Sequence, residues 1–188
     1  MKNYDTVQES GQRIMVNTTT ATVYYTPSGF LEQAFASAAA ADAYSTRAPI
    51  VNTMTLNFLM GRAIELAIKA YLLSKGTSMD VLRGRTFGHD LEAGLALAVE
   101  KGFNTGEITT PTDQAVIVVL NGHYSEKDFE YPQKSHMSGF NEGIVRAMTN
   151  RVLRTAAIEV WGQEAYNCHA KEPEALLNGL LIGSDAKY

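Results

Sequence analysis

Apolar residues recur at helical spacing along most of this chain. Residues 54–73 are the most apolar stretch and are interrupted by polar side chains at only a few positions. Because a helix that is apolar on nearly all sides is normally buried, the pattern predicts a long central helix over residues 51–75. Gly76 follows as a stop, since glycine readily adopts the left-handed backbone that ends many helices.

The same spacing predicts further helices on both sides of the central one. A first helix begins at Pro27 and Ser28, with Ser28 as its capping residue, and ends before Pro49. Later helices are expected over residues 91–102, from residue 111 onward, over residues 139–161, and over residues 174–181 in the tail. The β-branched run at residues 116–120 also fits a buried strand, but its place between helices favours helix.

Three segments lack this helical pattern. Residues 77–88 are expected to form a loop, and residues 124–132 a polar loop rich in aromatic side chains. Residues 14–26 are rich in Thr, Val and Tyr, a composition typical of strands. The chain is therefore expected to be all-α, with an extended or β-like arm at residues 1–27, a helical domain at 28–163 and a tail at 164–188.

Composition agrees with one globular domain. Hydrophobic residues make up 45% of the 188 residues and charged residues 19%, which excludes wholesale disorder. The formal net charge is −4, so the chain has no overall basic character of the kind that attracts nucleic acid. A local basic patch is compatible with that total.

Cysteine usage and the amino-terminal residues indicate the cytoplasm. Cys168 is the single cysteine, so no intrachain disulfide can form. Residues 1–13 are polar and lack the apolar core of a signal peptide. Charged residues inside the central helix argue against a membrane span.

A charged stripe interrupts the central helix. Arg62, Glu65 and Lys69 stand at positions i, i+3 and i+7, and therefore share one face. In a buried helix these charges require partners or a water-filled cleft. The alternative is a solvated edge of a partly exposed helix, and both interpretations stay open.

A second candidate group lies in the segment RGRTFGHDL at residues 83–91. Asp90 occupies the position of a helix cap. His89 belongs to the residue type that titrates near neutral pH and moves protons, while Arg83 and Arg85 are suited to hold a phosphate. Phosphodiester chemistry would use these residues, although a structural His89 beside two surface arginines is equally compatible.

Tyr131 is the last candidate for a functional site. Tyr131 precedes a proline, which favours an extended backbone, and its ring either stacks on a base or anchors the loop in the core. The Cys168–His169 pair lacks the spacing of a metal site, and the chain has no glycine-rich nucleotide motif. Neither a metal ion nor a cofactor is expected.

Three segments together resemble the HEPN superfamily of small helical domains. They are GRAIELAIKAYLL at residues 61–73, GHDL at 88–91 and FEYP at 129–132, in the order of the E-L-x-x-K-x-x-L, G-H-D-L, Y-P subgroup. The resemblance covers roughly residues 29–161. It implies an up-and-down bundle of four or five helices that often forms homodimers, and a role in toxin–antitoxin or phage-defence systems with an antitoxin or other protein partner.

Many HEPN proteins are metal-independent ribonucleases with an Arg-x4–6-His motif. Arg83 and His89 have this spacing, and Arg85 is one residue short of it. The resemblance thus implies RNA or nucleotide binding in which both arginines bind phosphate, His89 transfers a proton, and Glu65 with Lys69 orients the site. The family motif usually lies near a late helix, so a non-catalytic protein-interaction module with a structural His–Asp turn is the alternative.

Helix geometry predicts that the two charged groups meet. Glu65 and Lys69 are about 6 Å apart along one helix face. A loop over residues 77–88 can return the chain so that the next helix runs antiparallel to the central one. We therefore expect Glu65, Lys69 and His89 to form one polar cluster, with the Asp90 carboxylate facing Lys69 and with Arg85 facing Glu65.

Overall fold

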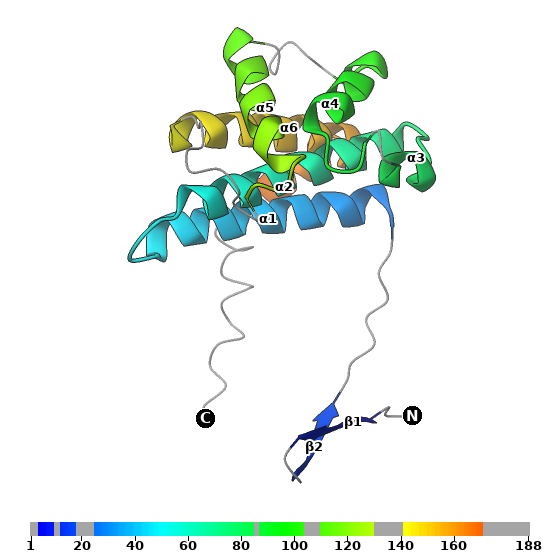
Figure 1. The fold of residues 1–188 in the computed structure, drawn as a ribbon. Coiled ribbons are helices and arrows are strands. Elements are labelled where there is room, and N and C mark those ends of the chain that lie inside the picture. The colour runs from blue at the N-terminus through cyan, green and yellow to red at the C-terminus, as the bar shows by residue number, and fades with distance from the viewer. Residues whose placement is uncertain are drawn as a thin grey trace.

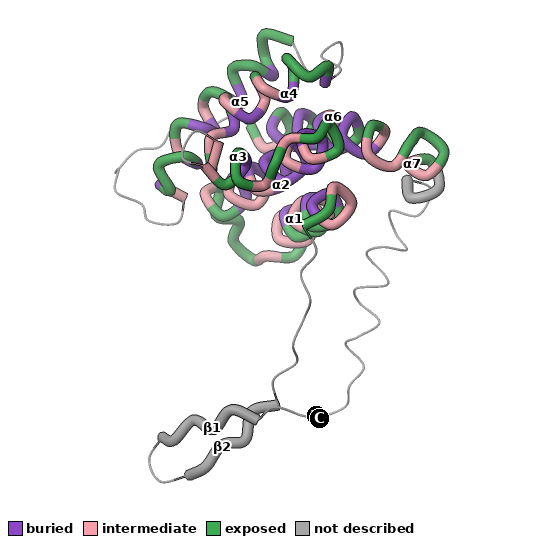
Figure 2. The backbone as a smooth tube through the Cα atoms, turned by 90° about the vertical axis from the view of Figure 1, so that its right-hand side faces the viewer, coloured by how far each residue is buried: buried purple, intermediate pink, exposed green. Residues whose placement is uncertain are grey.

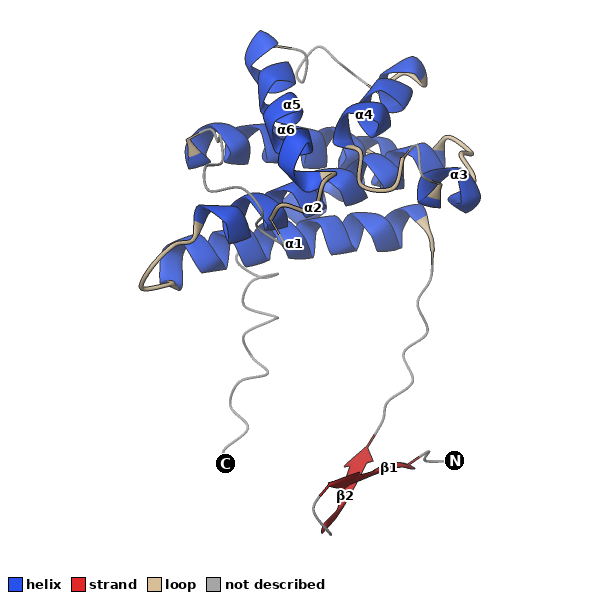
Figure 3. Cartoon of the chain, viewed as in Figure 1, coloured by secondary structure: helices blue, strands red, loops and turns tan. Residues whose placement is uncertain are grey.

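Helix is the dominant secondary structure of the chain. The computed structural model describes residues 4–9, 12–17, 25–84, 87–103, 110–129 and 141–170 (Figure 1, Figure 3). Its helices are α1 (Pro27–Arg47), α2 (Thr53–Ser74), α3 (Met79–Arg83), α4 (Leu91–Glu100), α5 (Pro111–Tyr124), α6 (Glu142–Trp161) and α7 (Gln163–Ala170). The strands β1 (Tyr4–Glu9) and β2 (Gln12–Asn17) pair in antiparallel orientation, with Tyr4 opposite Asn17. The expected all-α class is confirmed for the part of the chain that forms the helical core.

Helix α2 is the central element, as its apolar pattern predicts. It begins where the Asn52 side chain accepts hydrogen bonds from the backbone of Met54 and Thr55. It ends before Gly76, which has a φ of 81°. Most of its apolar side chains from residue 56 to residue 72 are buried, so the prediction of a buried central helix is confirmed.

The other helices cover α2 from several sides. Helices α1, α2 and α6 lie side by side, while α4 and α5 stand across α2 (Figure 1). Ser45 at the end of α1 donates to Glu142 at the start of α6 over 2.6 Å, so these helices are antiparallel. Lys75 after α2 pairs with Glu159 near the end of α6 at 3.1 Å, so α2 and α6 run parallel.

The core lies where these helices meet. Buried residues concentrate on the faces of α1, α2, α4, α5 and α6 that point toward one another (Figure 2). Burial of this apolar surface is the main stabilising contribution to such a fold. Among the described helices, none combines the length and the hydropathy needed to cross a bilayer.

The predicted cap of the first helix was wrong by two residues. Thr26 caps α1, because its hydroxyl accepts from the backbone N–H of Gly29 at 3.0 Å, and Pro27 occupies the first helical position. The hydroxyl of Ser28 instead accepts a 3.3 Å hydrogen bond from the indole N–H of Trp161 on α6. Ser28 therefore joins two helices.

Two predicted loops are partly helical. The segment at residues 77–88 contains α3, whose cap is Ser78 and whose Leu82 is fully buried. Tyr124, expected to open a polar loop, is the last residue of α5 and is buried. Residues 116–120 are helical, as their position between helices favours. The tail helix expected at residues 174–181 lies outside the described residues.

Candidate functional site

A buried carboxylate, that of Glu65, is the centre of the polar cluster on α2. Its side chain is 4% exposed. Lys69 donates to one carboxylate oxygen at 2.5 Å. Arg62 and Tyr124 donate to the other oxygen at 3.1 Å and 2.6 Å. The charged stripe is therefore a hydrogen-bonded network around a buried acid rather than a solvated edge.

His89 completes this cluster from the turn before α4. Its Nδ1 lies 3.3 Å from Glu65 Oε2, and its ring meets the Tyr124 ring edge-on at a centroid distance of 5.9 Å. The His89 side chain is 44% exposed, in contrast to the buried carboxylate beside it. The prediction that Glu65, Lys69 and His89 lie together is confirmed.

The contact between Glu65 and His89 determines the histidine tautomer. An ionised carboxylate only accepts hydrogen bonds, so the hydrogen must be on Nδ1 of His89. The unprotonated Nε2 of the half-exposed ring is then the atom that takes up or returns a proton. The pair is thus a carboxylate–histidine dyad with a buried carboxylate and a half-exposed imidazole.

The turn that carries His89 is held on α2 and α5. Lys69 donates to the backbone carbonyl of Gly88 at 2.8 Å, immediately before His89. Asp90 caps α4 by accepting from the backbone of Ala93 at 2.9 Å. The Asn121 side chain of α5 accepts from the backbone of Leu91 at 2.7 Å and donates to Asp90 at 3.1 Å.

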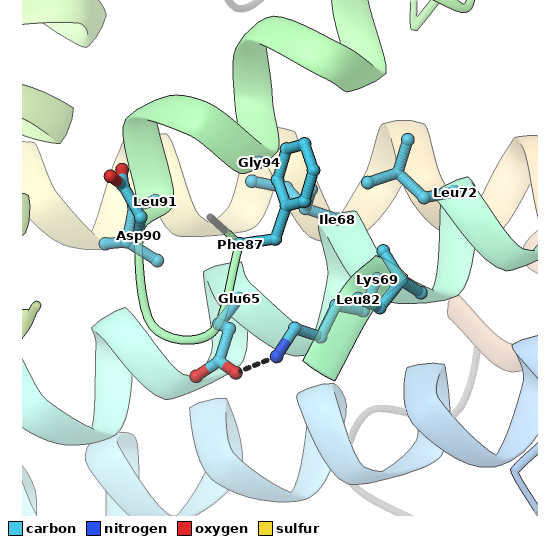
Figure 4. Close-up of a pocket in the computed structure, with 9 residues that line it drawn as sticks. All are labelled: Glu65, Ile68, Lys69, Leu72, Leu82, Phe87, Asp90, Leu91 and Gly94. Atoms are coloured by element: carbon cyan, nitrogen blue, oxygen red, sulfur yellow. Dashed lines mark hydrogen bonds and ion pairs between the residues drawn. The ribbon is translucent and has the colours of Figure 1, made fainter. Parts of the chain in front are cut away.

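One expected contact is wrong. Asp90 does not offer its carboxylate to Lys69, because the backbone of Ala93 and the amide of Asn121 both donate to Asp90 Oδ1 and hold the carboxylate toward α4 and α5. Figure 4 shows the Asp90 carboxylate directed away from the Lys69 amine, which instead meets Glu65. The role of Asp90 is to fix the start of α4 beside His89.

Tyr124 is the site residue that the sequence pattern assigned to a loop. Its ring packs on α2 at Gly61, where an added Cβ would lie 2.8 Å from a ring carbon. A glycine at this point allows the ring to approach the helix and its hydroxyl to reach Glu65. Two signals were available in the sequence: the four-residue spacing from Leu120 to Tyr124, and a glycine within an otherwise apolar helix.

The cluster stabilises the ionised form of Glu65. Burial alone would raise the pKa of this carboxyl, but the charge of Lys69, the hydrogen bonds from Lys69 and Tyr124, and the charge of Arg62 together lower the pKa below its ordinary value. Burial and the neighbouring Glu65 charge raise the pKa of the Tyr124 hydroxyl well above its ordinary value. Glu65 is therefore ionised and Tyr124 neutral at physiological pH.

A small cavity lies between the face of α2 that carries Glu65 and Lys69 and the start of α4. It has a volume of about 10 Å³ and is lined by nine residues of α2, α3 and the segment around the start of α4 (Figure 4): Glu65, Ile68, Lys69, Leu72, Leu82, Phe87, Asp90, Leu91 and Gly94. That volume is enough for about one water molecule. The cavity is too small for a substrate.

A larger cleft opens on another side of the same two residues. It has a volume of about 320 Å³ and is lined by Glu65 and Lys69 together with Arg62, Arg83 and Tyr25 among others. The guanidinium of Arg83 lies over the Tyr25 ring, 4.4 Å from its centroid. Arg83 is therefore a residue of this cleft, where its guanidinium contacts the Tyr25 ring.

Two of the predicted site residues, Arg85 and Tyr131, fall outside the described residues. A second histidine, His123, pairs with Asp128 at 3.1 Å in the turn after α5. In the described part of the chain, no group of three or more His, Cys, Asp or Glu residues is placed to hold a metal ion.

Comparison with known proteins identifies no relative. No protein-family model matches the chain, no curated protein matches its sequence, and no solved structure matches its fold.

Proposed function

We propose that this chain is a HEPN-like helical bundle that binds RNA and cleaves it without a metal ion. The observation that carries the proposal is the dyad of His89 and Glu65, in which a half-exposed imidazole lies 3.3 Å from a buried, ionised carboxylate. A base held in one tautomer by a carboxylate is suited to general acid–base catalysis. The GHDL segment that supplies His89 is also part of the family resemblance.

His89 acts on the ribose hydroxyl in this proposal. Its Nε2 takes the proton of the RNA 2′-hydroxyl, and the 2′-oxygen attacks the adjacent phosphorus. The bond from phosphorus to the 5′-oxygen breaks, and the leaving oxygen takes a proton from water. The products are a 2′,3′-cyclic phosphate and a 5′-hydroxyl end. Glu65 stabilises the imidazolium that forms on His89.

Cationic side chains beside the dyad would compensate the negative charge of the RNA substrate in this proposal. Arg62, Lys69 and Arg83 all line the larger cleft. They compensate the negative charge of a phosphodiester, which neither a buried carboxylate nor a neutral tyrosine can do. A local basic cleft of this kind is compatible with the overall formal charge of −4.

The alternative is a non-catalytic protein-interaction module. One observation favours it: the Glu65 carboxylate accepts from Arg62, Lys69 and Tyr124, as in a structural lock between α2 and α5. In that case the exposed His89 ring would belong to a surface for a protein partner.

The family resemblance also supports a proposal about the oligomeric state and the biological system of the protein. The protein is then a cytoplasmic homodimer of a toxin–antitoxin or phage-defence system, and its partner is an antitoxin or another protein. Sedimentation at micromolar concentration tests the dimer, and a single monomeric species would contradict it.

RNA cleavage in the presence of EDTA tests the proposed activity. The wild-type protein is expected to cleave a mixed-sequence RNA and to leave 5′-hydroxyl ends, while His89→Ala loses the activity by at least about a hundredfold. His123→Ala is the matched control, because it removes a histidine with a carboxylate partner outside the cluster. Loss of activity in both variants, or in neither, would contradict the proposal.

A further inference from the structure

We propose that Asn121 of α5 is a positioning residue for His89, because its side-chain amide fixes the backbone that follows the histidine and so holds the imidazole against Glu65. This inference rests on the proposed function and adds a residue to it. Asn121 acts through the backbone of the turn before α4 rather than on the RNA.

The Asn121 side chain uses both ends of its amide on the start of α4. Its oxygen accepts from the backbone N–H of Leu91 at 2.7 Å. Its nitrogen donates to the carboxylates of Asp90 at 3.1 Å and of Glu92 at 3.0 Å. Asn121 is 8% exposed, so its amide is largely shielded from water and depends on these partners. The three hydrogen bonds therefore fix the three residues directly after His89.

The chemistry of these partners requires an amide. A backbone N–H needs an acceptor and the two carboxylates need donors, and the asparagine side chain offers both on one planar group. An aspartate at position 121 would lack the donors, and a leucine would lack the donors and the acceptor. The partners thus define both the residue type and the orientation of the Asn121 amide.

The backbone around His89 is held from two directions. The carbonyl of Gly88, directly before it, accepts from Lys69 of α2 at 2.8 Å. The N–H of Leu91, two residues after it, donates to Asn121 of α5. The His89 side chain is 44% exposed, so packing covers only part of the ring. The position of the imidazole therefore depends strongly on these two backbone contacts.

The face of α5 that carries Asn121 also holds the other half of the dyad. Asn121 and Tyr124 are three residues apart and share one face of the helix. Tyr124 donates at 2.6 Å to Glu65 Oε2, the carboxylate oxygen that lies 3.3 Å from His89 Nδ1. Helix α5 thus positions the carboxylate through Tyr124 and the imidazole through Asn121.

Nitrogen-15 NMR of the neutral imidazoles tests this role in the full chain. Asn121→Leu keeps a side chain of similar size but removes all three hydrogen bonds. We expect His89 in this variant to lose its preference for the hydrogen on Nδ1, because the ring is no longer held against Glu65. His123 is the internal reference and should keep its wild-type tautomer, since its Nδ1 lies 3.1 Å from Asp128 in the turn after α5.

RNA cleavage in the presence of EDTA gives the second measurement. Asn121→Leu is expected to lower kcat by about tenfold to a hundredfold and to change KM by less than about twofold, because it displaces the base and leaves the cationic cleft intact. The matched control is Asp113→Asn, which removes the charge of a buried carboxylate that pairs with Arg151 of α6 at the other end of α5. This control should keep the wild-type kcat and the wild-type tautomer of His89.

The outcomes separate this inference from the proposed function. An equal kcat and an equal His89 tautomer in Asn121→Leu and Asp113→Asn would overturn the inference, because Asn121 would then only stabilise the fold. Cleavage that depends on His89 would survive that result. A changed His89 tautomer in Asn121→Leu, in a protein that does not cleave RNA, would support the positioning role and contradict the proposed function. If Asn121→Leu does not fold, Asn121→Ala carries the same expectations, since it removes the same bonds and favours helix.

Discussion

The hydroxyl of Tyr124 donates a 2.6 Å hydrogen bond to Glu65 across 59 residues of sequence. It joins the last residue of α5 to the middle of α2, and both side chains are buried. The same carboxylate oxygen lies 3.3 Å from His89. The position of His89 therefore depends on how α5 docks on α2.

Removal of that hydroxyl measures its contribution. Tyr124→Phe leaves the ring on Gly61 but withdraws one donor from the ionised Glu65. We expect the free energy of unfolding in urea to fall by about 1.5–3 kcal/mol, as for hydrogen bonds to charged groups. The control is Tyr44→Phe, whose hydroxyl accepts an exposed 2.9 Å bond from Asn52. If the free energy of unfolding fell by similar amounts in the two variants, the buried hydrogen bond would contribute no more than the exposed one.

Two glycines provide a matched test of the close approach between α2 and α5. Gly61→Ala places a methyl group 2.8 Å from the Tyr124 ring, whereas a Cβ at Gly122 on α5 meets nothing within 4 Å. We expect Gly61→Ala to destabilise the protein by about 1–3 kcal/mol through overpacking. Gly122→Ala should be neutral or stabilising by up to about 1 kcal/mol, because alanine favours helix. Thermal unfolding compares them, and a stabilised Gly61→Ala protein would refute the packing.

The lowered pKa of Glu65 predicts acid sensitivity. A carboxyl whose pKa is lower in the folded state contributes stability above its unfolded pKa, here 4.5, and loses it as the pH falls through the folded pKa. Wild-type stability should therefore decline below pH 4.5 more steeply than that of Glu65→Gln. Urea unfolding between about pH 3 and pH 6 measures the difference. Equal slopes for the two proteins would count against an ionised Glu65 in the cluster.

The raised pKa of Tyr124 predicts a loss of folding stability at alkaline pH. A group whose pKa is higher in the folded state contributes stability that is complete below its unfolded pKa, here 10.0, and lost as the pH rises toward the folded value. The wild-type protein should therefore lose stability above pH 10.0, and the advantage over Tyr124→Phe should shrink there. Chemical unfolding near pH 9 and pH 11 compares the two proteins, and a constant difference would disagree with burial of the phenol.

Local sequence spacing was sufficient to predict that Glu65, Lys69 and His89 lie together. The four-residue spacing of Glu65 and Lys69 fixes their common face, and the short return to α4 brings His89 to it. The same reasoning failed for Asp90, because Asn121 from α5 and the cap of α4 use its carboxylate. A contact from a distant helix cannot be read from local spacing.

The remaining parts of the site were not predicted because they depend on contacts between distant segments or on very short elements. Tyr124 reaches Glu65 only after α5 has folded across α2, and Gly61 has no pattern of its own beyond its place in an apolar helix. Helix α3 has five residues, too few for helical periodicity to be recognised. Tyr25 lies in the predicted arm, so its stack with Arg83 had no local signal.

The tautomer of His89 is the property that depends most closely on its contact with Glu65. Nitrogen-15 NMR of the wild-type protein, at a pH about two units above the ordinary imidazole pKa of about 6.5, distinguishes the two neutral forms. We expect His89 to carry its hydrogen on Nδ1, donated to Glu65, with Nε2 unprotonated. A His89 ring with its hydrogen on Nε2 would contradict the dyad, and with it the role of His89 as the base in RNA cleavage.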